Sequence, residues 1–165
     1  FSDFFKPNKE KKFILICNIM KSAISIMQKS LENNNITFEI SMACHNKILT
    51  FANELLQIFV SLLDNAKDAL LENKVIGAKI GIEIIEDAHF VSINISDNAG
   101  GISESILMHL GEPYVSSKAL NGGGLSIYMS KVILEKHLLG KISWENIDNG
   151  ACFSVKLPLP EKESL

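Results

Sequence analysis

The chain of 165 residues lacks several features that would assign it to a broad class of protein. Its formal net charge of −3 gives no excess of positive charge for binding nucleic acid. No apolar run approaches the roughly 20 residues of a membrane span, and no signal peptide is visible. It also shows no internal repeat or low-complexity tract. We therefore expect a cytoplasmic domain without a nucleic-acid partner, although a parent protein could be anchored in a membrane.

Cysteine is scarce as well. Cys17, Cys44 and Cys152 are odd in number and widely spaced, which favours reduced thiols in the core over disulfides or a zinc site. The chain opens with Phe1-Ser-Asp-Phe-Phe-Lys-Pro7 and lacks an initial methionine, so we expect it to be a piece of a longer protein.

The remaining composition, 47% hydrophobic and 21% charged, is typical of one globular domain with a full core. Hydrophobic spacing predicts helices over 13–31, 54–72 (with Asn53 as N-cap), 103–109 and 125–138. Alternation predicts strands over 36–40, 48–51, 78–85, 89–96, 141–145 and 151–157, the last two forming a hairpin that turns near 148–150. The irregular order of helices and strands favours one mixed or antiparallel sheet covered by helices, an α+β fold.

The most informative segment is Ile95-Ser-Asp-Asn-Ala-Gly-Gly-Ile102, in which a carboxylate ends an apolar strand and two glycines follow. Asp97 has the same parity as Val91, Ile93 and Ile95, so its side chain should point inward. An inward carboxylate is costly unless hydrogen bonds are donated to it. The glycines would allow another molecule to approach the backbone closely. Taken alone, the segment is equally compatible with a strand that runs into a tight turn.

The helix predicted over 54–72 carries polar residues on one side, including Asn65 and Asp68. This pattern also fits an ordinary amphipathic helix with a solvated face. However, the amide oxygen of Asn65 is a suitable single ligand for Mg²⁺ when phosphates and waters complete the octahedron.

A second glycine cluster, Asn121-Gly-Gly-Gly124, comes directly before a predicted helix. Glycines at a helix N-terminus expose backbone N–H groups to an anion, although such a cluster can also be a simple flexible loop. The preceding segment, Glu112-Pro-Tyr-Val-Ser-Ser-Lys118, adds hydroxyls and a cation. We interpret 111–124 as a lid over phosphate, with Lys118 as a candidate phosphate contact.

In this order, the Asn65-Ala66 pair, Asp97-x-Ala-Gly-Gly-Ile102, Glu112-Pro-Tyr-x-Ser-Ser-Lys118 and Gly122-x-Gly-Leu125 closely resemble the ATP-binding catalytic domain of two-component sensor histidine kinases. The wider superfamily includes gyrase-type topoisomerases, Hsp-type chaperones and mismatch-repair ATPases. The resemblance covers roughly 36–160. It implies a two-layer α/β sandwich of the Bergerat type, in which helices cover one face of a mixed sheet. It further implies the end of a dimerisation helix and a linker over 1–12, the ATP-binding domain over 13–160, and a tail over 161–165.

Carried over by position, Asn65 resembles the Mg²⁺ ligand of that family, Asp97 the acceptor for the adenine amino group, and Gly101 the glycine against which the base lies. The other positions implied to contact ATP are Asp68, Ala99, Ile102, Ser117, Lys118, Gly122, Gly123, Gly124 and Leu125. The implied cofactors are ATP and Mg²⁺.

Several positions depart from the family pattern. Ala99 replaces the first glycine after the aspartate, Gly111 replaces an aromatic residue, and Ser126 replaces the last glycine of the second cluster. Ser61 stands where an asparagine is usual, and Asp68 stands where a basic residue is common. These changes leave the adenine contact intact and bear on the phosphate contacts of the lid.

No histidine has the setting of a phosphoacceptor, which is a helix with an acidic residue next. We therefore expect the acceptor to lie upstream, on the chain's own dimerisation domain, and this chain to contain no certain catalytic residue. The predicted function is transfer of the γ-phosphoryl group of Mg-ATP to that histidine, with a response regulator as partner of the full-length kinase. The fragment alone could be a monomer, and we expect a homodimeric parent. The alternatives are a hydrolytic ATPase of the same superfamily and a nucleotide-binding interaction module without phosphotransfer.

Overall fold

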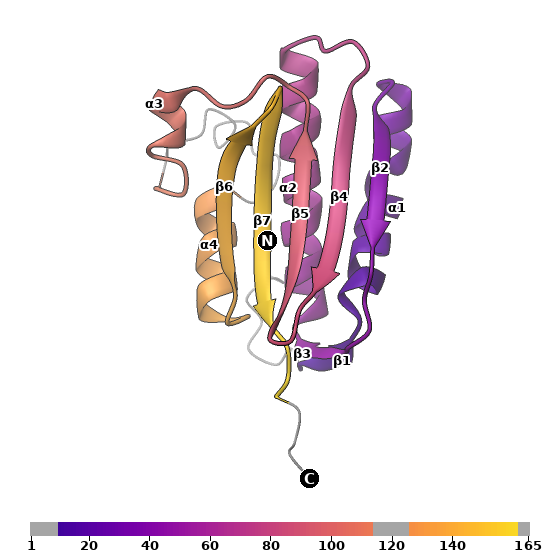
Figure 1. Ribbon diagram of the computed structural model, residues 1–165, viewed down its shortest axis with the longest axis vertical. Coiled ribbons are helices and arrows are strands. Elements are labelled where there is room, and N and C mark those ends of the chain that lie inside the picture. The colour runs from indigo at the N-terminus through magenta and orange to yellow at the C-terminus, as the bar shows by residue number, and fades with distance from the viewer. Residues whose placement is uncertain (1–9, 114–125, 162–165) are drawn as a thin grey trace.

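A computed structural model describes residues 10–113 and 126–161 of the chain (Figure 1). The elements are β1 (Lys12–Ile14), α1 (Ile16–Asn33), β2 (Thr37–Met42), β3 (Ile48–Thr50), α2 (Ala52–Glu72), β4 (Lys79–Glu86), β5 (Phe90–Asp97), α3 (Glu104–Leu107), α4 (Ile127–Lys136), β6 (Lys141–Ile147) and β7 (Gly150–Pro158). No helix within these two ranges is long and apolar enough to cross a membrane.

The main sheet has five strands in the order β2-β4-β5-β7-β6. β2 runs parallel to β4, whereas every other neighbouring pair is antiparallel, so the sheet is mixed. Figure 1 shows α1, α2 and α4 packed on one face of this sheet, behind it in the view. The predicted fold class, an α+β sandwich with helices on one face of a mixed sheet, is confirmed.

The register of the central strands explains which residues form the core. Ile82 of β4 pairs with Ile95 of β5, which pairs in turn with Phe153 of β7, and all three belong to the apolar face that the helices cover. Residues between them, such as Asn94 and Ser154, face the other side and are partly exposed. The period of two seen in the sequence therefore reflects one buried and one open face.

Helix α2 supplies the centre of the opposing layer. Leu55, Phe59, Leu62 and Leu63 are all at most 1% exposed. Burying each such side chain contributes on the order of 1.5–3 kcal/mol relative to leaving it in water. This burial fixes α2 against the sheet, and the polar residues on its other positions are fixed with it.

Two predicted helix starts are wrong. The first helix was expected from Phe13, but 12–14 form β1, an antiparallel partner of β3, and α1 begins at Ile16. Pairing with a distant segment overrides the local helical spacing there. Asn53 was expected as the N-cap of α2, but the helix begins one residue earlier with Phe51 as N-cap and no side-chain cap bond. Phe51 is partly buried, so packing and not a side-chain cap sets this end.

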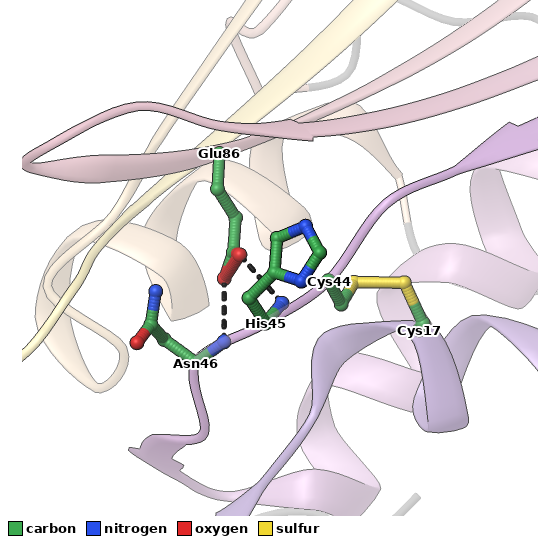
Figure 2. Close-up of a disulfide and its surroundings, with 5 residues drawn as sticks. All are labelled: Cys17, Cys44, His45, Asn46 and Glu86. Atoms are coloured by element: carbon green, nitrogen blue, oxygen red, sulfur yellow. Dashed lines mark hydrogen bonds between the residues drawn. A yellow bond between two sulfur atoms is a disulfide. The ribbon is translucent and has the colours of Figure 1, made fainter.

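The expectation that all three cysteines are reduced is also wrong. Cys17, in the first turn of α1, and Cys44, between β2 and β3, form a disulfide with their Cα atoms 6.0 Å apart (Figure 2). Cys152 is free, as expected, but it lies on the open face of the sheet with Ser154 and not in the core. The pairing could not be deduced from the sequence because it depends on how α1 packs beside the loop that follows β2.

Candidate nucleotide-binding site

Those predicted nucleotide contacts that the structure describes lie toward one end of the sheet. Figure 1 shows the C-terminal ends of α2 and β5, and the turn between β6 and β7, at the same end of the molecule. The side chain of Asn73, just after α2, donates to the carbonyl of Ala99 at 2.9 Å and ties two of these segments together. Asn65 lies about two turns before the end of α2. The fold therefore brings Asn65, Asp68 and Asp97 toward the same end of the sheet.

Asp97 ends β5 on the apolar side of the sheet, opposite Ile80 of β4. Its side chain is partly buried, as its parity predicts. Its Oδ1 accepts the backbone N–H of Ala99 at 3.0 Å and that of Ala151 at 3.4 Å. These bonds compensate for removing the carboxylate from water and hold its orientation. Asp97 is thus a preorganised acceptor at the edge of the core.

The glycine segment after Asp97 has a backbone that requires glycine. Gly100 and Gly101 have φ values of +96° and +90°. A Cβ at Gly100 would meet nothing within 4 Å, but one at Gly101 would lie 3.1 Å from Oδ1 of Asn146. The open space that a ligand could enter is therefore beside Gly100, whereas the protein itself fills the side of Gly101 where a Cβ would stand.

The side chain of Asn146, on β6, makes two hydrogen bonds to the backbone at the end of the glycine segment. Its Oδ1 accepts the N–H of Ile102 at 2.8 Å, and its Nδ2 donates to the carbonyl of Ile102 at 2.8 Å. The β6–β7 turn adds a bond from the Gly100 N–H to the carbonyl of Asn149 at 2.7 Å. The β6–β7 hairpin therefore fixes the conformation of the glycine segment, which is the backbone against which a base would lie.

Two further contacts come from the start of β4 and from β7. Asn98 accepts the N–H of Lys79 at 2.8 Å and donates to the carbonyl of Gly77 at 3.0 Å. At Gly150, any Cβ would collide with the carbonyl oxygen of Asp97. The glycine at position 150 is required so that β7 can pass this close to the end of β5.

A cavity of about 550 Å³, open to solvent, adjoins the glycine segment. Its lining includes Asn73, Ile76, Gly100 and Gly101. Neither Asn65 nor Asp97 lines it. The cavity therefore marks accessible space beside the glycines but does not by itself join the two predicted contacts.

The polar side of α2 differs from a solvated face. Ser61 is 5% exposed, and Asn65 and Asp68 are partly buried. Each of these three residues interacts with another part of the structure. Their spacing in the sequence places the three residues on one side of α2. Their burial shows that this side is not simply a solvent-exposed face.

Glu54, near the start of the same helix, has a separate role. It is 4% exposed, and its Oε2 lies 3.2 Å from Nδ1 of His137, the C-cap of α4. Eleven residues separate Glu54 from Asn65, which corresponds to about 16 Å along a helix axis. Glu54 therefore joins α2 to α4 and lies too far from Asn65 to activate a water beside a metal there.

Ser117, Lys118, Gly122, Gly123, Gly124 and Leu125 lie outside the described residues. The residues flanking them are described. Ser126, which replaces a glycine of the motif, is the N-cap of α4 and accepts the N–H of Met129 at 3.1 Å. At Gly111, which replaces an aromatic residue, a Cβ would lie 2.6 Å from the ring of Trp144. The indole of Trp144 occupies the space that a side chain at 111 would need.

The histidines have the surface and boundary positions expected of them. His45 and His89 are exposed outside helices, and His109 lies 3.2 Å from the carboxylate of Glu112 just after α3. His137 is held by Glu54, as described above. None lies within a helix before an acidic residue.

Sequence reasoning missed the residues that hold the glycine segment, which are Asn73, Asn98, Asn146 and Gly150. Asn146 lies 44 residues from its partner Ile102, so no local signal could have identified it. The Asp-Asn-Gly turn that begins at Asp148 did identify the hairpin, but not its contact with Asp97.

Comparison with known proteins agrees with the motifs. The family model for histidine kinase-, DNA gyrase B- and HSP90-like ATPases matches residues 50–161. Sporulation kinase B of Bacillus subtilis (strain 168) is 30% identical over 150 residues, which cover 90% of this chain. The chain spans only 34% of the length of that relative.

Solved structures share the fold. The nucleotide-free catalytic domain of histidine kinase ThkA aligns with a TM-score of 0.77 and 19% identity, over 91% of this chain and 96% of that one. ThkA in complex with the response regulator TrrA aligns with a TM-score of 0.73 and 20% identity, over 91% of this chain and 42% of that one. The match of the family model over most of the chain shows that it belongs to the histidine kinase-, DNA gyrase B- and HSP90-like ATPase family, as its resemblance to sensor histidine kinase catalytic domains predicts.

Proposed function

We propose that this chain binds Mg-ATP and transfers the γ-phosphoryl group to a histidine on the dimerisation domain of a two-component sensor histidine kinase. The observation that carries the proposal is the Asp97 carboxylate, held by two backbone N–H groups beside a glycine backbone, at the same end of the sheet as the C-terminal end of α2, the helix that carries Asn65. In this proposal Asp97 accepts from the adenine amino group, and Ala99, Gly101 and Ile102 form the backbone beside the base.

The side chains near this end of α2 fit a magnesium ion that binds together with the nucleotide. Among the residues that the structure describes, no three His, Cys, Asp or Glu side chains form a group that could hold a metal. Mg²⁺ is commonly bound through one or two protein ligands, with phosphates and waters supplying the rest. The amide oxygen of Asn65 would be that protein ligand, with Asp68 one turn further along α2. When bound, the ion would neutralise charge on the phosphates.

Ser117, Lys118, Gly122, Gly123, Gly124 and Leu125 complete the proposed ATP contacts on the basis of the sequence motif alone. Phosphoryl transfer needs mostly positioning and charge neutralisation, so the chain need not supply a nucleophile. The acceptor histidine belongs to another segment, because the four histidines of the chain have unsuitable settings. The ATP-binding domain is proposed to cover 13–160 and to work in the cytoplasm, where ATP is available.

The same geometry argues against ATP hydrolysis. A hydrolytic relative needs a carboxylate to activate water, and the position one turn before Asn65 is Ser61, whose hydroxyl is a poor base at neutral pH. Glu54 lies too far along α2 and is engaged with His137. We therefore favour kinase over ATPase function. The response regulator is the proposed partner of the whole kinase, which we propose is a homodimer.

Three measurements test the function. Calorimetry should detect ADP and ATP binding to this chain, and phosphate release from ATP should stay at the background rate. A longer protein that contains the chain and its upstream segment should become labelled from [γ-³²P]ATP with the acid lability of phosphohistidine. Steady phosphate release would instead indicate a hydrolytic ATPase, and binding without labelling would indicate a nucleotide-binding interaction module.

A further inference from the structure

The Cys17–Cys44 disulfide joins the first turn of α1 to the loop between β2 and β3 (Figure 2). In Figure 1 these segments and the two-stranded β1–β3 ribbon lie at the end of the sheet opposite the C-terminal end of β5, which carries Asp97. Cys17 follows β1 by three residues, and Cys44 precedes β3 by four. The bond therefore joins the two chain segments that lead into the ribbon. Apart from it, the ribbon has a register of only three residue pairs.

The loop that carries Cys44 is held in place without the disulfide. Figure 2 shows the Glu86 carboxylate accepting the backbone N–H groups of His45 and Asn46, at 2.6 and 3.1 Å. On the other side of Cys44, the N–H of Ala43 donates to the carbonyl of Ile84 at 2.9 Å. Cys17 is fixed by the buried face of α1. The two cysteines would therefore stay adjacent after reduction, and the bond could form again with little movement.

The two cysteines are unequally accessible. Cys17 is 8% exposed and belongs to the core, whereas Cys44 is partly exposed at its edge. An external thiolate would therefore reach the sulfur of Cys44 and displace Cys17 as the leaving thiol. Thiol–disulfide exchange depends on such access and proceeds through a mixed disulfide.

We propose that Cys17 and Cys44 form a reversible thiol–disulfide exchange site, at which the cellular thiol pool sets how firmly the β1–β3 ribbon is anchored. The proposal rests on the proposed function in one respect, since an ATP-dependent kinase domain works in a compartment that keeps thiols reduced. Disulfides there are rare, and those that occur are usually catalytic or redox-sensing.

The exchange is balanced with glutathione as the reductant. A glutathione thiolate attacks Sγ of Cys44, the protein S–S bond breaks, and Cys17 leaves as a thiolate that takes up a proton. A second glutathione thiolate attacks the sulfur of glutathione in the mixed disulfide, and Cys44 leaves and is protonated in turn. Two glutathione molecules are oxidised to glutathione disulfide while the protein disulfide is reduced to two thiols. Glutathione disulfide drives the same steps in reverse.

Reduction should loosen the ribbon and leave the nucleotide site unchanged. β1 is the first element of the part of the chain that the structure describes, and its pairing partner is β3. Without the disulfide, the three residue pairs between β1 and β3 are the remaining strand pairing of the ribbon. Asp97 and the glycine segment lie at the far end of the sheet, separated from the ribbon by the buried core (Figure 1).

The test equilibrates the folded chain in anaerobic buffers of graded glutathione to glutathione disulfide ratio. After an acid quench and unfolding, N-ethylmaleimide adducts are counted by mass spectrometry. With three cysteines in total and one outside the disulfide, we expect one adduct at oxidising ratios and three at reducing ratios, with the same midpoint from both directions. Cys152 is the internal reference.

Single variants test the direction of attack. In Cys17→Ser, the remaining Cys44 should form a mixed disulfide with glutathione disulfide several-fold faster than Cys17 does in Cys44→Ser. Hydrogen exchange at 12–14 and 48–50 should be several-fold faster in the reduced wild type, whereas exchange in β5 should stay constant.

Several outcomes would overturn the proposal. They are three adducts at every ratio, one adduct even in the most reducing buffer, equal mixed-disulfide rates in the two variants, or equal exchange of the ribbon in both redox states. Calorimetry with ADP in each redox state separates the two proposals. Failure to bind ADP in either state refutes the proposed function, while the adduct count still decides the thiol site.

Discussion

Replacing Asp97 with asparagine separates the charge of this carboxylate from its structural hydrogen bonds. Oδ1 accepts from Ala99 and Ala151, and an amide oxygen can accept the same two bonds. The variant should therefore fold, with its amide oxygen toward the protein. It loses the negative charge and presents an NH₂ donor where we propose that the adenine amino group donates.

The magnitude follows from the loss of one hydrogen bond to a charged group. Such a bond contributes on the order of 1.5–3 kcal/mol, which corresponds to about 10- to 150-fold in affinity. We expect ADP affinity to fall within that range in calorimetric titrations, with an unchanged circular dichroism spectrum. Unchanged affinity in a folded Asp97→Asn variant would refute Asp97 as the adenine contact.

Asp87 provides a matched control. Its Oδ1 also accepts two backbone N–H groups, from His89 and Phe90, both at 2.7 Å, but it lies in the turn at the other end of β5. Asp87→Asn should leave ADP affinity unchanged. The N–H groups of His89 and Phe90 hold the pKa of this carboxyl below its usual value. Because the pKa is lowered in the folded state, the Asp87 carboxylate stabilises the fold at pH values above the pKa of the unfolded chain. This stabilisation is lost as the pH falls through the folded-state pKa. The free energies of unfolding of wild type and Asp87→Asn should therefore converge at acidic pH.

Three other variants test the remaining parts of the site. Asn65→Ala should retain ADP binding without Mg²⁺ but lose most of the gain that Mg²⁺ gives, and an equal gain in wild type and variant would make Asn65 structural. Asn146→Ala removes both bonds to Ile102. We expect the free energy of unfolding in urea to fall by about 1–3 kcal/mol and ADP binding to weaken. No change in either measurement would contradict the inference that Asn146 fixes the backbone of the glycine segment. Gly150→Ala forces a Cβ against the Asp97 carbonyl and should destabilise the fold by about 1–3 kcal/mol in thermal unfolding, whereas wild-type stability would show that β7 can move aside.

Elements with one buried face were predictable from the sequence. β4 and β5 alternate buried apolar residues with more exposed ones because the helices cover one side of the sheet, and a slip of one residue would expose the buried isoleucines. The inward position of Asp97 followed from the same parity. For α2, the apolar spacing was sufficient to identify the helix, although not its first residue.

Features that depend on pairing with distant segments were not predictable. Phe13 was expected to begin a helix, but Lys12–Ile14 forms a strand because it pairs with β3 over 48–50. The disulfide has the same origin, since its two cysteines are 27 residues apart. The support that Asn146 gives to Ile102 arises only when the closing hairpin packs beside the end of β5.

The two proposals assign different tasks to the two ends of the sheet, and α2 is the element that spans both. β3 leads directly into α2, whose 21 residues extend for about 32 Å toward the Asp97 end. A change at the β1–β3 ribbon could therefore reach Asn65 only if α2 moved as a rigid body. The buried contacts of Phe59 and its neighbours oppose such a shift, because interior packing leaves little free space for a sliding helix. Redox control at the ribbon would then change how firmly β1 is held against β3 and leave nucleotide affinity constant. A redox-dependent ADP affinity would instead show that α2 shifts between two packed positions.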